Sequence, residues 1–126
     1  MHKSKLAGFI IDCQNAQPRV AAEFWSTALG MQSQQLPPPE GDSYVRLIDP
    51  NSELAIEVQT VAHPSRVHLD IETDDIEAEV RRLEALGARR VARIHTWWVM
   101  EAPTGHRFCI VQARSPSFGA SASEWP

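Results

Sequence analysis

The chain has few cysteines, no long apolar segment and no excess of positive charge, and each absence excludes a class of protein. Its 126 residues include only two cysteines, Cys13 and Cys109, too few for a small scaffold held by disulfides. No apolar run is long enough to span a membrane, and the charged start Met-His-Lys-Ser-Lys leads into no signal peptide. We therefore expect a cytoplasmic protein with free thiols and no membrane partner.

Lysine and arginine never gather into a basic stripe. The chain carries 12 of them against 16 aspartate and glutamate residues, which gives a formal net charge of −4 at pH 7. Proteins that bind nucleic acid need a concentrated positive surface to neutralise phosphates. Nucleic acid is therefore excluded as a partner.

What the chain does have is the composition of one globular domain. Hydrophobic residues make up 43% of it, and a chain of 126 residues can bury a core without disulfides. We expect a single domain over residues 1–114. Residues 115–126, rich in serine, alanine and proline, are expected to form a loosely held tail.

A strand followed by a helix occurs twice. The run Arg66-Val-His-Leu-Asp-Ile-Glu-Thr alternates polar and apolar residues like a strand, and an amphipathic helix after it ends at Gly87. Earlier, an apolar strand over residues 6–12 precedes a helix that ends at Gly30. The repetition predicts a duplicated fold.

Three more strands follow each helix, so each half reads β-α-β-β-β. Turn-rich residues separate the strands in both halves. Modules are expected over residues 6–59 and 66–112, with a short edge strand followed by a loop within 32–43 and further strands near 44–48, 54–59, 90–95, 97–101 and 107–112.

Both predicted helices have an apolar stripe that should be buried. In the second helix, Asp74 and Glu77 are spaced as a capping box. The residues expected to be buried on the stripes include Phe24 in the first helix and Ile76, Val80, Leu83 and Leu86 in the second.

Several separated motifs together resemble the glyoxalase/bleomycin-resistance/dioxygenase family, which has the vicinal-oxygen-chelate fold. They are the helix end Phe24-Trp25…Leu29-Gly30, the strand His68-Leu-Asp-Ile…Asp75, and Ala102-Pro-Thr-Gly-His-Arg-Phe-Cys109. The likeness is greatest to short glyoxalase-like members and covers residues 6–112. It implies an α+β fold in which two βαβββ modules form a curved eight-stranded sheet around a cleft.

The resemblance also implies four metal-ligand positions, which fall on Gly8, Glu57, His68 and Cys109. Glu57 and His68 are usual ligands, Gly8 has no side chain, and Cys109 would have to act as a thiolate. The implied metal set is His68, Glu57 and Cys109, with zinc, nickel, manganese or iron as the ion. A histidine and a glutamate alone would hold such an ion weakly. Strand alternation offers Asp70, Glu72 and Asp12 as replacement carboxylates.

Two classes of function remain open. The first is non-catalytic binding of a small organic molecule in an aromatic-lined cleft. The second is a metal-dependent lyase or isomerase of the glyoxalase I type, with a dioxygenase relative less favoured, in which Glu57 would move a proton. In either class the ligand-binding residues are expected to be His68, Trp97, Trp98, Cys109 and Phe24.

Several candidates also have a purely structural interpretation. His68 fits a cross-strand hydrogen bond about as well as a ligand contact, and Cys109 fits a small core residue. Trp97 and Trp98 are adjacent, so one should join the core and the other could face a ligand. The histidines of turns, His63, His95 and His106, are expected in solvent. Exposed sheet edges and the habit of the family predict a homodimer.

Overall fold

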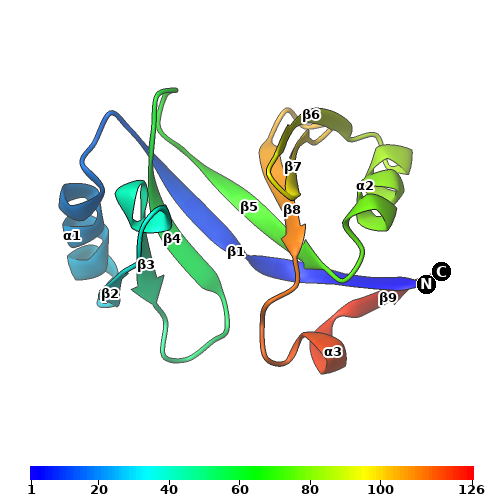
Figure 1. The fold of residues 1–126 in the computed structure, drawn as a ribbon, viewed down its shortest axis with the longest axis horizontal. Helices are drawn as coiled ribbons and strands as arrows, with labels where there is room; N and C mark the ends of the chain where they lie inside the picture. Colours follow the sequence, from blue (N-terminus) through cyan, green and yellow to red (C-terminus); the bar gives the residue numbers. More distant parts are fainter. The chain divides into compact units, whose positions relative to one another are not determined.

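The computed structural model of the protein describes residues 1–126, and the chain divides into two compact units (Figure 1). Unit 1 comprises Met1–Ala7 and His68–Pro126, and unit 2 comprises Gly8–Val67. The long strand β1 (His2–Gln14) begins in unit 1 and continues into unit 2. None of the helices is both long and apolar enough to cross a membrane.

Unit 2 contains the first β-α-β-β-β module. Its sheet has the order β2-β3-β4-β1, in which β1 and β4 are parallel and the other neighbours are antiparallel. The elements after β1 are α1 (Pro18–Leu29), β2 (Gln32–Gln35), a short 3-10 helix (Glu40–Asp42), β3 (Tyr44–Ile48) and β4 (Ala55–Val61). These bounds confirm the predicted element order of the first half.

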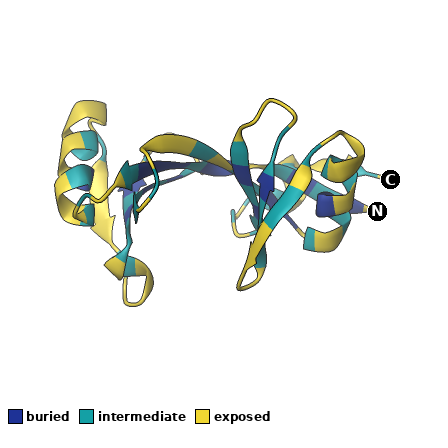
Figure 2. Cartoon of the chain, turned by 90° about the horizontal axis from the view of Figure 1, so that it is seen from above, coloured by how far each residue is buried: buried dark blue, intermediate teal, exposed yellow.

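The core of unit 2 lies between α1 and the sheet, but α1 buries less than its apolar stripe predicts. Ala22 is its one buried residue, and Ala21 and Trp25 pack beside it against strand residues such as Ile56 and Val58. Phe24 is 63% exposed, so its predicted burial is wrong. The apolar arc is wider than the contact with the sheet, and much of the surface of α1 is exposed (Figure 2).

Unit 1 contains the second module, in which β5 and β8 are parallel and β8, β7 and β6 are antiparallel neighbours. Its core contains Val80 of α2 with Met100, Phe108 and Ile110 of the strands. The elements are β5 (Arg66–Thr73), α2 (Ile76–Ala85), β6 (Arg89–Ile94), β7 (Trp97–Glu101) and β8 (Arg107–Gln112). The two predicted βαβββ modules of an α+β fold are thus confirmed.

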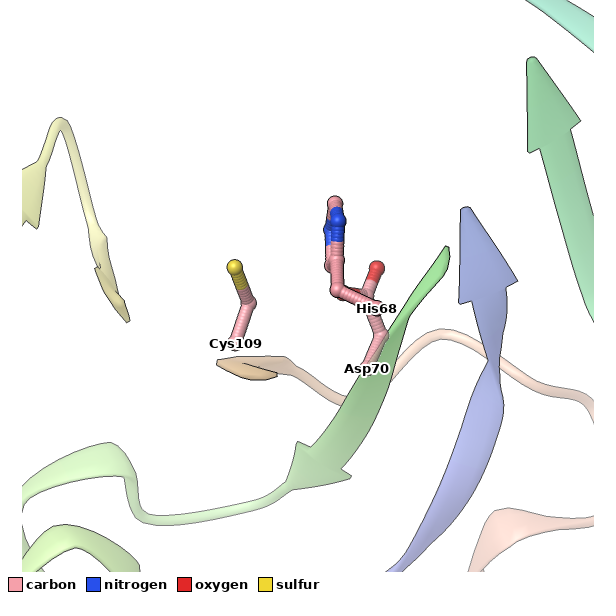
Figure 3. Close-up of side chains that lie close together, drawn as sticks. All are labelled: His68, Asp70 and Cys109. Carbon is pink, nitrogen blue, oxygen red and sulfur yellow. The ribbon is translucent and has the colours of Figure 1, made fainter. Parts of the chain in front are cut away.

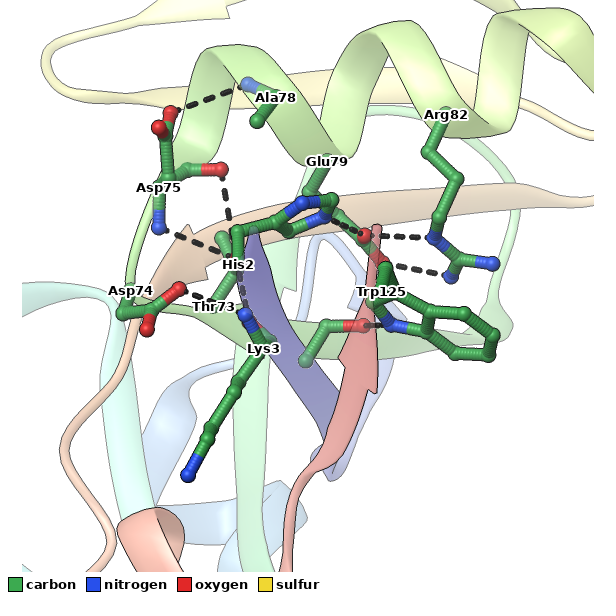
Figure 4. A network of polar contacts seen from close by, with 10 residues as sticks. His2, Lys3, Thr73, Asp74, Asp75, Ala78, Glu79, Arg82 and Trp125 are labelled. Carbon is green, nitrogen blue, oxygen red and sulfur yellow. Dashed lines mark hydrogen bonds and ion pairs between the residues drawn. The ribbon is translucent and has the colours of Figure 1, made fainter.

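The ends of α2 differ by one residue from the prediction. Asp75, not Asp74, caps the helix, because its carboxylate accepts a hydrogen bond of 3.0 Å from the Ala78 N–H. Asp74 instead accepts one of 2.8 Å from the Lys3 N–H (Figure 4). Leu86 follows the last helical residue and is 65% exposed, so its predicted burial is wrong.

The C-terminal residues are ordered, which corrects the expected loose tail. They form α3 (Phe118–Ser121) and a ninth strand, β9 (Ser123–Trp125), which pairs antiparallel with the start of β1. The Trp125 indole N–H donates a hydrogen bond of 2.9 Å to the Ser4 hydroxyl, and the Arg82 guanidinium lies 3.8 Å from the centre of the ring (Figure 4). The free energy of these two Trp125 contacts helps to offset the conformational entropy that is lost when the C-terminal residues are held in place.

A buried carboxylate joins these N- and C-terminal strands to α2. Glu79 is fully buried and lies 2.8 Å from His2 Nε2, while Arg82 donates two hydrogen bonds of 2.8 and 2.9 Å to its oxygens (Figure 4). Burial alone would raise the pKa of Glu79, but hydrogen bonds from Arg82, His2 and Ser4 outweigh it, and the pKa lies below its ordinary value.

Replacing Glu79 with alanine should destabilise the protein by about 3 kcal/mol, because it leaves Arg82 and His2 without their shared partner. Glu77→Ala, which removes an exposed carboxylate of the same helix, should cost less than about 1 kcal/mol. Urea denaturation would measure both. Since the folded-state pKa of Glu79 is depressed, its contribution is complete above the unfolded-state pKa and is lost as the pH falls through the folded-state pKa. An equal cost for both variants would contradict this role.

Candidate functional site

The sheet of unit 1 has one face against α2 and one face opposite, which we call the open face. Met100, Phe108 and Ile110 point to the α2 side, where they meet Val80. Because side chains alternate along a strand, their neighbours in sequence point to the open face. The open face therefore carries the even-numbered residues of β5, among them His68 and Asp70, and the odd-numbered residues of β7 and β8.

Three side chains on the open face, His68, Asp70 and Cys109, form what we call the β5–β8 cluster (Figure 3). Their nitrogen, oxygen and sulfur atoms all lie within 4.8 Å of one another. His68 Nε2 is 3.6 Å from Asp70 Oδ1, and the two side chains are only 13% and 20% exposed. An imidazole, a carboxylate and a thiol thus converge in a partly dehydrated place.

Strand register explains why these residues meet. Asp70 and Cys109 are direct partners in the parallel pairing of β5 with β8, and His68 precedes Asp70 by two residues on the same face. The sequence analysis placed His68 and Cys109 at one site, and the structure brings these two together. Asp70, which had been only a replacement carboxylate, is the third member.

Glu57, the expected third ligand and catalytic carboxylate, lies on β4 of unit 2. Its side chain is 16% exposed and forms an ion pair of 3.1 Å with Arg46 of β3. The guanidinium gives this carboxylate a partner within its own unit. An approach of Glu57 to His68 stays a prediction.

Gly8 shows why the first implied ligand position has no side chain. A Cβ atom there would lie 1.9 Å from the carbonyl oxygen of Ala55, its partner on β4. Such a contact is far inside van der Waals distance, so the backbone of β1 and β4 approaches too closely for any residue but glycine. Close strand packing occupies the position that a metal ligand would need.

The aromatic candidates separate onto different surfaces. Trp98 packs against the core under α2 and lies 5.0 Å from the Arg90 guanidinium, so it is the tryptophan that joins the core. Trp97 lies two residues before Val99, the partner of Cys109, and so stands on the open face. Phe24 lies in unit 2, in a shallow hollow on the outer side of α1.

Sequence reasoning missed two groups of polar residues. On the open face, Arg107 and Glu101 form an ion pair of 3.2 Å beside the cluster. In unit 2, the buried Asp12, which the sequence offered only as a replacement carboxylate, lies 4.0 Å from the partly exposed His63 and 3.9 Å from Arg66. The alternation that singled out His68 would have found Arg107, two residues before Cys109.

The second thiol of the chain has a different environment. Cys13 lies on the α1 side of β1, among the residues packed against the core of unit 2. Burial and then the charge of Asp12 raise the pKa of the Cys13 thiol. It is the less reactive kind of cysteine, a small core residue.

The β5–β8 cluster offers a donor set that suits zinc. Two ligands of a tetrahedral zinc ion lie about 3.4 Å apart when the bonds are about 2.0–2.3 Å long. The separation of 3.6 Å between His68 and Asp70 is close to this, whereas the overall span of 4.8 Å requires the side chains to draw together. The three residues therefore fit a metal only after a small adjustment, and they supply one ligand fewer than a closed site.

Comparison with known proteins agrees with this architecture. The family model of the glyoxalase-like domain matches residues 8–111, so the chain belongs to this family. No protein in the comparison with curated proteins matched the chain.

Solved structures with the same fold are distant in sequence. Methylmalonyl-CoA epimerase from Mycobacterium tuberculosis is 19% identical, with a TM-score of 0.61 over 86% of this chain and 88% of that one. A glyoxalase/bleomycin resistance protein/dioxygenase superfamily member from Vibrio splendidus is 18% identical, with a TM-score of 0.52 over 85% and 98%. A hypothetical protein from Bacillus halodurans is 12% identical, with a TM-score of 0.64 over 89% and 96%. At these identities the likeness concerns the fold alone.

Proposed function

We propose that this chain binds a small organic molecule on the open face of unit 1, with the β5–β8 cluster as its polar anchor and Trp97 as an apolar wall. The observation that carries this proposal is the convergence of His68, Asp70 and Cys109 within 4.8 Å. Binding sites typically combine an apolar or aromatic surface with a few convergent polar groups, and this face has both. Membership of the glyoxalase-like family supports it, since the fold serves varied small-molecule chemistries.

Non-catalytic binding is favoured over metal chemistry because two of the implied metal-ligand positions are poorly suited to hold a metal. Gly8 cannot carry a side chain, and Glu57 has an arginine partner in its own unit. Asp70 lies beside His68, so the imidazole already has a polar partner within the cluster.

Replacing His68 with alanine should weaken ligand binding by about tenfold or more and change the free energy of unfolding by less than about 1 kcal/mol. A ligand first found by screening small organic molecules in thermal-shift assays would be titrated by calorimetry. His106→Ala is the matched control, because His106 is exposed in the turn between β7 and β8. A large loss of stability with unchanged binding would show that His68 is structural.

A metal-dependent lyase or isomerase is the second candidate, favoured by the imidazole, carboxylate and thiol of the same cluster. A similar structure bears the name of an isomerase, methylmalonyl-CoA epimerase. In this candidate the cluster would hold a divalent ion that polarises oxygens of the substrate, and Glu57 would serve as the base.

Metal analysis separates the two candidates. The protein would be incubated with zinc, nickel, manganese or iron, freed of unbound metal and analysed by elemental mass spectrometry. We expect well under one ion per chain, because three imperfectly spaced donors bind a metal weakly. Cys13→Ser should leave the metal content unchanged. One ion per wild-type chain that is lost in both Cys109→Ser and His68→Ala would instead establish the metal-dependent candidate.

We further propose that the chain forms a homodimer. The exposed apolar side chains Val20 and Phe24 of α1, each 63% exposed, give a second copy an apolar surface to cover. Light scattering at micromolar concentration should give twice the chain mass of 14.1 kDa. Phe24→Glu should shift the mass toward the monomer, whereas Leu86→Glu, at an equally exposed position of unit 1, should not. A monomeric wild type would refute the proposal.

A further inference from the structure

We propose that Arg107 binds a carboxylate group of the ligand on the open face of unit 1. The inference rests on the proposed function, since it names the chemical class of the molecule that the β5–β8 cluster would bind. It follows from where Arg107 lies, from how it is held, and from the apolar surface next to it.

Register places Arg107 in direct line with the cluster. It precedes Cys109 by two residues on β8, so it points to the open face about 6.7 Å farther along the strand. The pairing of Leu69 with Phe108 puts His68 level with Arg107, as Asp70 is level with Cys109. The four side chains form a block, two from β5 and two from β8.

Arg107 is held in place but not neutralised. One oxygen of Glu101 receives both the Arg89 Nη2 group, at 2.7 Å, and the Arg107 Nε group, at 3.2 Å. One carboxylate thus serves two guanidinium groups, which leaves one positive charge in excess. The contact uses only Nε of Arg107, and the two terminal amino groups of this arginine contact no acceptor in the structure.

These terminal amino groups are the part of a guanidinium that binds a carboxylate. Their N–H bonds are parallel and coplanar, and they match the two oxygens of a carboxylate in a bidentate contact. The Arg107 side chain is 32% exposed, so it is partly dehydrated yet open to a ligand. A partly dehydrated guanidinium binds a carboxylate with a more favourable free energy than a fully solvated one does.

The surface beyond the cluster is apolar on β7 and β8, whereas β5 carries the buried Glu72 level with Val111, where its carboxylate accepts a hydrogen bond from the Ser115 hydroxyl. Val111 follows Cys109 by two residues on β8, and the pairing of Trp98 with Ile110 puts Trp97 level with Val111. Val99 lies between Trp97 and Glu101 on the same face of β7. A molecule lying along β8 would meet a cation, then the cluster, then an aromatic wall. Surfaces in this order would fit a carboxylic acid whose remaining part is aromatic or apolar.

The test uses pairs of probes that differ only in charge. Benzoate and benzamide, and 3-phenylpropanoate and 3-phenylpropanamide, would be titrated into the wild-type protein and followed by ¹H–¹⁵N NMR. Each carboxylate should bind about tenfold or more tightly than its amide. Arg107→Gln should abolish this preference, and Arg107→Lys should retain part of it because the charge remains without the planar pair of donors.

Arg93→Gln is the matched control. It removes an exposed arginine of β6 whose strand partner, Trp98, lies on the α2 side of the sheet, so the preference for carboxylates should persist. Equal binding of carboxylate and amide by the wild type, a preference that survives Arg107→Gln, or no binding of any carboxylate would each overturn the inference. If the probes bind regardless of charge and His68→Ala abolishes that binding, the proposed binding function stands and only the role of Arg107 falls.

Discussion

The parallel register of β5 against β8 is the constraint on which the candidate site depends. Moving β5 by one residue would turn His68 and Asp70 toward α2 and bring Leu69 and Ile71 to the open face. The register is fixed from the other side of the sheet, because Ile110 is completely buried and Ile71 packs with it under α2. Burying the apolar set thus decides which polar side chains meet.

Residues from both ends of the chain contact α2, the helix that covers this sheet. His2 reaches Glu79 of α2, and Trp125 of β9 packs on Arg82. Glu79 is fully buried, and a buried carboxylate persists only where hydrogen bonds replace water. The position of α2 over the sheet, and with it the core that fixes the strand register, is therefore tied to the chain termini.

Periodicity predicted the elements well and their environments less well. The strands at Trp97–Glu101 and Arg107–Gln112 and the helix ending before Gly30 agree with the sequence pattern, because alternation and glycine are local signals. The exposure of Phe24 and the ordering of Trp125 depend on how much sheet a helix covers and on partners more than 40 residues away, which no local pattern contains. Asp70 and Arg107 join the site through the register between β5 and β8, which also connects residues distant in sequence.

The open face of unit 1 also offers hydrogen-bond donors to the oxygen atoms of a ligand. The terminal amino groups of Arg107 lie beside the cluster and can bind ligand oxygens directly as hydrogen-bond donors. The charges on this face are mixed, because Arg107 shares Glu101 with Arg89 while Asp70 and Glu72 place carboxylates on the neighbouring strand. An anionic oxygen ligand is therefore favoured at the Arg107 end of the block and not over the whole face.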